Sequence, residues 1–159
     1  MSTVDATIRP ARPDEAATLT ELAIASKAYW GYDEAFMQRF AIVIAVDPAY
    51  VDEHDVWIAE TDGEIAGFYA LIDRGEIAVL DHLWLSPIHI GRGLGRHLFE
   101  HALRRATDMH AHRMEWEAEP SATGFYERMG AVPVREVTSE MGRQLQIFGR
   151  DLSAPEIRG

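Results

Sequence analysis

Three glycines at alternate positions, Gly91, Gly93 and Gly95, follow an apolar segment and precede an amphipathic one. Glycine lets the backbone turn tightly and approach a ligand closely, and a helix that begins at such a turn directs its unpaired N–H groups at the same point. Arg92 and Arg96 add positive charge beside the turn, in a chain whose formal net charge is −11. These residues predict a binding site for a phosphate or pyrophosphate group.

Three kinds of glycine-rich turn could account for this pattern. A P-loop requires Gly-Lys-Ser/Thr, and that sequence does not follow the turn. The dinucleotide-binding fingerprint requires Gly-x-Gly-x-x-Gly in a leading strand–helix–strand unit, whereas these glycines follow three expected antiparallel strands. A purely structural turn is the third alternative, although one permissive residue would be enough for it.

The elements that must position this turn follow from the spacing of apolar residues. Helical spacing predicts helices at 14–26, 33–46, 94–106 and 120–129. Apolar strand patterns predict strands at 7–9, 56–60, 65–72, 77–85, 132–137 and 143–148, and alternation predicts one at 113–118. Asp62-Gly63 favours a hairpin between 56–60 and 65–72. We therefore expect a mixed α/β fold with a central, mostly antiparallel sheet of about seven strands and about four helices.

Composition limits the class of protein. The 159 residues, 47% of them hydrophobic, suit a single domain spanning 1–159. With 26 acidic and 15 basic residues, the chain should repel nucleic acid and favour cationic small molecules, although an acidic surface could serve solubility alone. The absence of cysteine excludes disulfides and a cysteine nucleophile, and no side-chain spacing suggests a metal site. The longest apolar run, 40–46, is too short for a membrane span, so we expect no membrane partner and a cytoplasmic location.

The order of these elements resembles that of the GNAT superfamily of acetyl-CoA-dependent N-acyltransferases over nearly the whole chain. The acyl-CoA signature of that family, Gln/Arg-x-x-Gly-x-Gly/Ala, aligns with residues 90–95, except that Ile90 occupies the Gln/Arg position. Backbone N–H groups can bind pyrophosphate whatever that side chain is. Residues 119–131 resemble the family segment Asp-Pro-Asn-Ala-x-x-Phe-Tyr-Glu-x-x-Gly, with Ser121 in place of asparagine. Serine can still donate one hydrogen bond to the pantetheine arm.

The resemblance implies that acetyl-CoA is the cofactor and CoA the product. The pantetheine would lie between the strands that flank the glycine-turn helix, where the main chain of Leu83 and Leu85 would pair with its amides like an added strand. Arg92 and Arg96 would hold its phosphates. The cofactor-binding residues expected on this basis are Leu83, Trp84, Leu85, Ile90, Gly91, Arg92, Gly93, Leu94, Gly95, Arg96, Ser121, Phe125 and Tyr126.

Acetyl transfer to an amine requires two proton transfers. The amine, with a pKa of ~10.4 if it is like lysine, must lose a proton before it attacks, and the departing thiolate must be protonated or stabilised. The resemblance places the hydroxyl of Tyr126 near the sulfur, so we expect Tyr126 to be the acid. Asp81, His82 and Glu117 are the candidates for the base, and the sequence does not choose among them.

The segment 26–33 joins the first two expected helices, and the resemblance implies that this region selects the acceptor. Tyr29, Trp30, Tyr32 and Asp33 could form a pocket for a cation, or could pack the helices together. We expect direct transfer in a ternary complex to the primary amine of a small-molecule acceptor. The alternatives are a protein lysine or N-terminal acetyltransferase and a non-catalytic acyl-CoA sensor. A homodimer through the strands at 132–137 and 144–148 is also possible.

Overall fold

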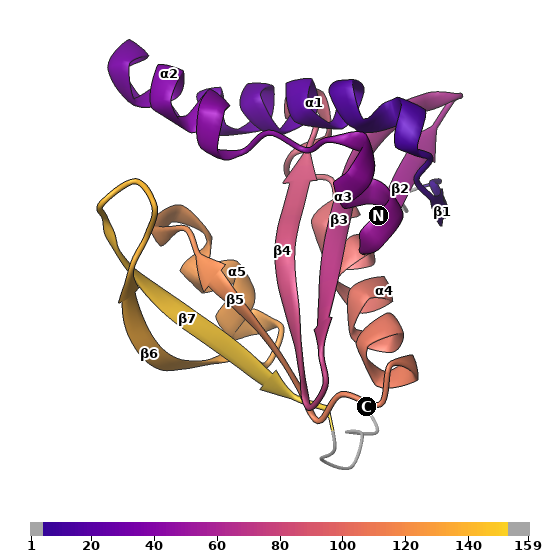
Figure 1. The fold of residues 1–159 in the computed structure, drawn as a ribbon, viewed down its shortest axis with the longest axis vertical. Coiled ribbons are helices and arrows are strands. Elements are labelled where there is room, and N and C mark those ends of the chain that lie inside the picture. The colour runs from indigo at the N-terminus through magenta and orange to yellow at the C-terminus, as the bar shows by residue number, and fades with distance from the viewer. Residues whose placement is uncertain (1–4, 153–159) are drawn as a thin grey trace.

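The computed structural model describes residues 5–152 and contains one seven-stranded sheet in the order β1-β2-β3-β4-β5-β7-β6 (Figure 1). All neighbouring strands are antiparallel except β4 and β5, which are parallel. This confirms the expected fold class. The strands are β1 (Thr7–Pro10), β2 (Asp55–Thr61), β3 (Glu64–Arg74), β4 (Ile77–Leu85), β5 (Arg113–Ala118), β6 (Val132–Thr138) and β7 (Gln144–Asp151).

Helices cover both faces of the sheet. Apolar residues of α1 and α3 pack with one face of β2 and β3, and those of α4 and α5 pack with the other face of β3, β4 and β5. In the described part of the chain, none of the helices has both the length and the apolar character needed to cross a membrane. The helices are α1 (Ala16–Ala28), α2 (Glu34–Val43), α3 (Pro48–Glu53), α4 (Leu94–Asp108) and α5 (Thr123–Arg128), with short 3₁₀ helices η1 (Pro13–Glu15), η2 (Pro87–His89) and η3 (Pro120–Ala122).

Helix α3 is an addition to the roughly four helices that the sequence predicts. The helix expected at 33–46 ends at Val43, and Asp47 and Pro48, which were expected only to stop it, begin a second one. The Asp47 carboxylate accepts a hydrogen bond from the Tyr50 N–H at 2.8 Å, and Pro48 occupies the first helical position. Both are standard helix-start features. The consequence for the site is that α3 presents Tyr50 to β4.

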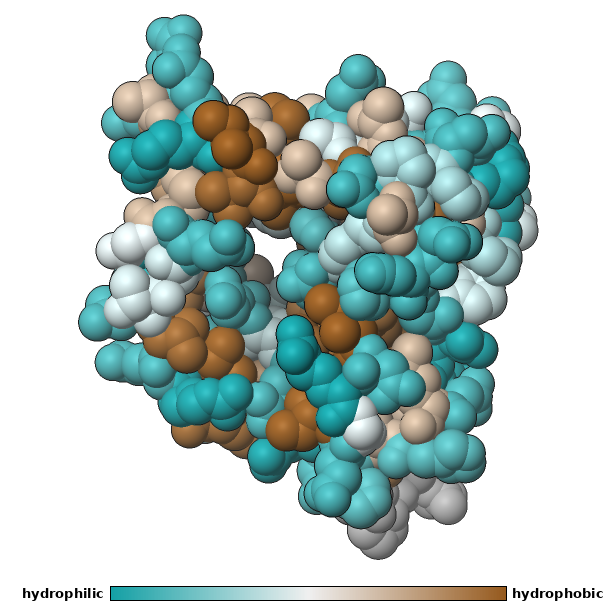
Figure 2. All heavy atoms as spheres, in the orientation of Figure 1, coloured by the Kyte–Doolittle hydropathy of each residue, from teal (hydrophilic) through white to brown (hydrophobic). Residues whose placement is uncertain are grey.

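A β-bulge in β4 lies close to the point where the sheet opens. The register between β3 and β4 passes from Ala70 opposite His82 to Leu71 opposite Leu80, so Asp81 is the extra residue. A bulge bends its strand and increases the local twist. β4 pairs with β5 only over its first three residues, ending at Val79, and the two strands then diverge. The molecular surface is hollowed beside this divergence, between α2 and the β6–β7 hairpin (Figure 2).

Candidate active site

The glycine turn has the geometry of an anion-binding site. Gly91 and Gly93 have φ values of +83° and +88°, in the left-handed region, and Gly93 caps the N-terminus of α4. His97 N–H makes the first bond of the helix, to the Gly93 carbonyl at 3.2 Å. In the described part of the chain, no amide from 91 to 96 donates a backbone hydrogen bond. These free N–H groups at a helix N-terminus suit a pyrophosphate, as the sequence predicts.

The side chains at the turn differ in what they can offer. Leu94 is fully buried in the core, so only its main chain is available to a ligand. Arg92 is exposed and adjoins the turn. Arg96 is 69% exposed and makes an ion pair with Glu100 at 3.2 Å, so it would have to exchange that partner for a phosphate. Ile90 is half-buried, and its N–H bonds to the Pro87 carbonyl.

The strand β4 forms one wall of the space between the diverging parts of β4 and β5, which we call the gap. Leu83 and Leu85 pack against the core cluster on the α4 side, whereas Trp84 lies on the opposite side, 5.7 Å from the ring of Phe40. Because the pairing with β5 ends at Val79, the main chain of β4 beyond it has no partner strand on the β5 side among the residues that the structure describes. This unpaired edge is what strand addition by a pantetheine requires.

Asp81 and His82 both meet Tyr50 of α3. The Tyr50 hydroxyl donates to Asp81 Oδ2 at 2.5 Å, and its ring lies 5.6 Å from that of His82. Trp84 Nε1–H donates to His82 Nδ1 at 3.0 Å. Since an indole N–H can only donate, neutral His82 carries its proton on Nε2, which lies 3.7 Å from Asp81 Oδ2. His82 therefore has no free lone pair for accepting a proton, and burial further lowers its pKa.

Glu117 occupies β5, across the divergence from Asp81. In residues 5–152, no hydrogen bond or ion pair engages its carboxylate. Partial burial raises the pKa of Glu117, and the charges of Asp81, Glu140 and Glu119 raise it further. A carboxylate that is unengaged and readily protonated is suited to accept a proton. The structure thus distinguishes Glu117 from the other two candidates for the base.

Tyr126 lies on α5 within a cluster of aromatic rings. Its ring centroid is 5.1 Å from that of Trp116, 5.9 Å from Phe99 and 6.1 Å from Phe148. Burial raises the pKa of Tyr126, and the charge of Glu119 adds to the effect. The hydroxyl therefore stays protonated at neutral pH, as a proton donor must. Ser121, one turn earlier, is exposed at the start of the same segment.

A lysine that the sequence analysis did not single out lies beside this segment. Lys27 of α1 is only 2% exposed, and its Nζ makes an ion pair with Glu119 at 2.5 Å. The ammonium lies over four aromatic rings, which we call the aromatic cage. Their centroids lie at 4.7 Å (Tyr32), 5.2 Å (Phe40), 5.5 Å (Phe36) and 6.0 Å (Trp84).

The structure places the residues of the segment 26–33 in different surroundings. A cation pocket exists there and includes Tyr32, but its cation is Lys27 of the chain itself. Asp33 does not face it: its carboxylate caps α2 by accepting from the Phe36 N–H at 2.8 Å. Tyr29 and Trp30 are about half exposed and contact each other edge to face, and the Trp30 N–H donates to the Lys27 carbonyl at 3.1 Å.

Glu119 connects three further side chains, which we call with it the Glu119 network: Lys27, Tyr32 and Arg143. The Tyr32 hydroxyl donates to Glu119 Oε1 at 2.7 Å, and Arg143 Nη1 lies 3.8 Å from the same oxygen. Burial opposes ionisation of Glu119, but the hydrogen bonds from Lys27 and Tyr32 prevail and lower its pKa. The network contains two cations and one carboxylate.

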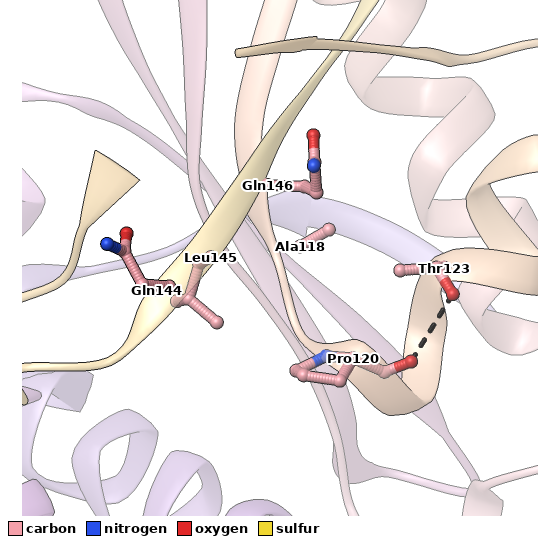
Figure 3. Close-up of a pocket in the computed structure, with 6 residues that line it drawn as sticks. All are labelled: Ala118, Pro120, Thr123, Gln144, Leu145 and Gln146. Carbon is pink, nitrogen blue, oxygen red and sulfur yellow. Dashed lines mark hydrogen bonds between the residues drawn. The ribbon is translucent and has the colours of Figure 1, made fainter. Parts of the chain in front are cut away.

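A small cavity of about 230 Å³ adjoins Glu119 on the β7 side of β5 (Figure 3). Thr123 Oγ1 donates to the Pro120 carbonyl at its floor, at 3.3 Å. In the described part of the chain, the residues that line the cavity come from β5, β7 and the segment that begins α5. Its lining residues are Ala118, Pro120, Thr123, Gln144, Leu145 and Gln146.

Two relatives of known class share part of the sequence. The peptidyl-lysine N-acetyltransferase YjaB of Salmonella typhimurium is 34% identical over 96 residues, covering 59% of this chain and 62% of that protein, so the chain spans less than two thirds of it. The peptidyl-lysine N-acetyltransferase YiaC of Escherichia coli is 28% identical over 127 residues, covering 77% and 81%.

Solved structures share the fold. A GCN5-related N-acetyltransferase from Rhodopseudomonas palustris superposes with a TM-score of 0.79 at 22% identity, covering 95% of this chain and 98% of that one. The PaiA N-acetyltransferase of Thermoplasma acidophilum, solved in complex with coenzyme A, superposes with a TM-score of 0.75 at 16% identity. The match covers 93% of this chain and 99% of that one. Residues 19–131 match the model of the acetyltransferase (GNAT) family. With the free amides of the glycine turn and the unpaired edge of β4, these matches identify the chain as a member of the GNAT acetyltransferase family.

Proposed function

We propose that the protein transfers the acetyl group of acetyl-CoA directly to the primary amine of a small-molecule acceptor, in a ternary complex. Acetyl-CoA as the cosubstrate follows from family membership. The amine acceptor is supported by the position and state of Glu117. Its carboxylate makes no described hydrogen bond or ion pair, has a raised pKa, and lies across the gap from Asp81. This carboxylate pair would attract an ammonium and take its proton. Direct transfer is supported by the lack of any cysteine that could carry the acetyl group.

Acetyl-CoA supplies an activated thioester, and the residues present fit it. In this proposal, the amides of 91–96 hold the pyrophosphate, and Arg92 and Arg96 neutralise phosphate charge. The main chain of Leu83 and Leu85 pairs with the pantetheine, while Ser121 and the half-buried Phe125 contact it from α5 and the segment before it. Leu83 and Leu85 belong to β4, residues 91–96 to the turn and the start of α4, Ser121 to η3 and Phe125 to α5.

Two side chains, Glu117 and Tyr126, transfer protons in this proposal, and Asp81 orients the amine. Glu117 takes the proton that the ammonium must lose before its nitrogen forms the new N–C bond. Asp81, held by Tyr50, attracts and orients the ammonium. As the C–S bond breaks, Tyr126 gives its proton to the sulfur and is restored by the second proton that the nitrogen loses. His82 stays neutral and supports Trp84 and Asp81 rather than acting as the base.

The cofactor site can be tested by thermal shift. Acetyl-CoA and CoA should raise the melting temperature, because a ligand at 100 times its Kd adds about 2.7 kcal/mol to the free energy of unfolding. Dephospho-CoA should raise the melting temperature less if an arginine binds the 3′-phosphate. Gly93→Ala should abolish the shift, because alanine is strained at φ +88° and the turn must reorient its amides. Gly75→Ala is the matched control: it has a similar φ of +80° and open space around it, in the β3–β4 turn. A full shift in Gly93→Ala would rule out this binding mode.

A second candidate acceptor is a lysine side chain of a protein, which the names of the relatives YjaB and YiaC favour. The two can be separated by measuring CoA release with a panel of small primary amines and with peptides that contain one lysine. We expect at least one small amine to give a kcat/KM about tenfold above that of the best peptide. Turnover with peptides alone would select the second candidate. Binding of acetyl-CoA without turnover on any amine would instead indicate a sensor.

The proposal also treats residues 1–159 as a single GNAT domain, which could form a homodimer. The sheet order supports only one of the two strands considered for pairing. β7 lies between β5 and β6, so both its edges are occupied, whereas β6 is an edge strand. Val132 and Val134 are exposed on β6 and could pack against a second copy.

A further inference from the structure

The most unusual group near the site is the ammonium of Lys27. Burying a charge is costly, and a buried ion pair is often no more stabilising than apolar residues of the same size. Lys27 is nevertheless enclosed by the aromatic cage and paired with Glu119. The pair contributes little net free energy of folding, but it holds the Glu119 carboxylate in one position.

Glu119 follows the last residue of β5, beyond the point where β5 pairs with β4. The β4–β5 pairing ends at Val79 opposite Glu115, so at the level of Glu119 no strand pairing joins β5 to β4. The Glu119 network spans this region instead, because Lys27 and Tyr32 belong to the α1–α2 region and Arg143 to the β6–β7 hairpin. Side chains rather than main chain therefore bridge the gap here.

Glu119 also begins the segment that carries the proposed acid. Its carbonyl accepts from the Ala122 N–H at 2.8 Å, starting η3, which leads directly into α5 and Tyr126. We propose that Lys27 is a positioning residue for acetyl transfer: by anchoring Glu119, it holds the segment 119–126, and with it Tyr126, in place. This inference rests on the proposed function of Tyr126.

The aromatic cage explains why a lysine can perform this role. Its four rings surround the ammonium with the negative faces of aromatic systems, so the cation is stabilised without a second carboxylate. Tyr32 contributes both a ring and a hydrogen bond to Glu119. Because Lys27 fills the cage, the acceptor amine is left with Asp81 and Glu117 as its anionic partners.

The test compares Lys27→Met, Glu119→Gln and the double variant. Methionine keeps the length and apolar stem of lysine and packs well on aromatic rings, so the fold should survive. We expect kcat to fall roughly tenfold in each single variant, because a small misplacement of a reacting group is costly. The KM for acetyl-CoA should change less than about twofold, since the glycine turn is untouched. The double variant should be no worse than the poorer single variant, because both act through one contact.

Hydrogen exchange supplies a readout that needs no acceptor. In Lys27→Met, amides of 120–128 should exchange roughly tenfold faster than in the wild type, since their anchor is lost. The matched control is Arg105→Met, which also removes a cation paired with a carboxylate (Asp55, 2.9 Å) and stacked on a ring (Trp57, 5.1 Å), away from the gap. It should leave kcat and exchange of 120–128 unchanged.

The results separate this inference from the proposed function. Unchanged exchange and kcat in folded Lys27→Met would overturn the positioning role, as would a double variant whose losses simply add. If Tyr126→Phe kept full activity, the acid role would fail, while faster exchange of 120–128 in Lys27→Met would still establish that Lys27 anchors the segment.

Discussion

Replacing Glu117 by glutamine is expected to lower kcat/KM for the amine about 10³-fold, within the ~10²- to 10⁴-fold range typical for loss of a general base. Glutamine keeps the size of the side chain but cannot take a proton. The melting temperature should not fall, because the substitution removes one of several carboxylates that repel one another around the gap. A loss of activity without a loss of stability would therefore report on chemistry rather than on folding.

The pH dependence of the wild type gives an independent check on Glu117. The base is active only when ionised, so kcat/KM should fall as the pH drops through the pKa of Glu117. Partial burial and the neighbouring carboxylates raise that pKa, so this acidic limb should lie above the range of an ordinary glutamate, and Glu117→Gln should remove it.

The pH profile of kcat/KM in Asp81→Asn tests whether Asp81, rather than Glu117, is the base. We expect a smaller loss in Asp81→Asn, mainly through a raised KM for the amine, because Asp81 attracts the ammonium and is already hydrogen-bonded to Tyr50. Full activity in Glu117→Gln together with a loss of the acidic limb in Asp81→Asn would transfer the role to Asp81.

Tyr126→Phe is expected to lower kcat about 10²-fold while leaving the affinity for acetyl-CoA unchanged. Phenylalanine preserves the ring contacts with Trp116, Phe99 and Phe148, so the aromatic cluster should remain packed. Only the hydroxyl is removed, and with it the proton for the departing sulfur. Steady-state kinetics beside a thermal-shift titration with acetyl-CoA would separate the two effects.

Phe125→Leu is a suitable comparison for Tyr126→Phe, since it changes the neighbouring ring and leaves the hydroxyl in place. It should affect binding of acetyl-CoA more than kcat. A Tyr126→Phe variant with wild-type kcat would show that the thiolate leaves without this proton donor, and a variant that no longer bound acetyl-CoA would assign Tyr126 a structural role instead.

The glycine turn and the two strands of the gap could be predicted because their signals are local. A left-handed turn at Gly91 and Gly93 needs glycine, and α4 carries its apolar residues at a strict helical spacing. The bounds predicted for β4 and β5, at 77–85 and 113–118, are those of the structure.

The groups that the sequence did not reveal depend on contacts between distant segments. The bulge at Asp81 is a property of the register with β3, and Tyr50 reaches Asp81 only because of the six-residue helix α3. One sequence signal did point to burial of Lys27: it follows Ala23 by four residues, on the buried face of α1. The helix predicted from the sequence ends at residue 26, so Lys27 was not assigned to its buried face. Its partner Glu119 could not be found from sequence spacing.

The divergence of β4 and β5 has a consequence for the lifetime of the protein. Among residues 5–152, the edge of β4 beyond Val79 and the facing edge of β5 beyond Glu115 do not pair with each other, and proteins otherwise avoid leaving such edges open. A cosubstrate that pairs with one of them would complete the sheet while it binds. Ligand binding then adds to the free energy of unfolding. Resistance of the enzyme to proteolysis and aggregation would thus rise and fall with the supply of acetyl-CoA, so that the metabolite would govern the amount of catalyst as well as its rate.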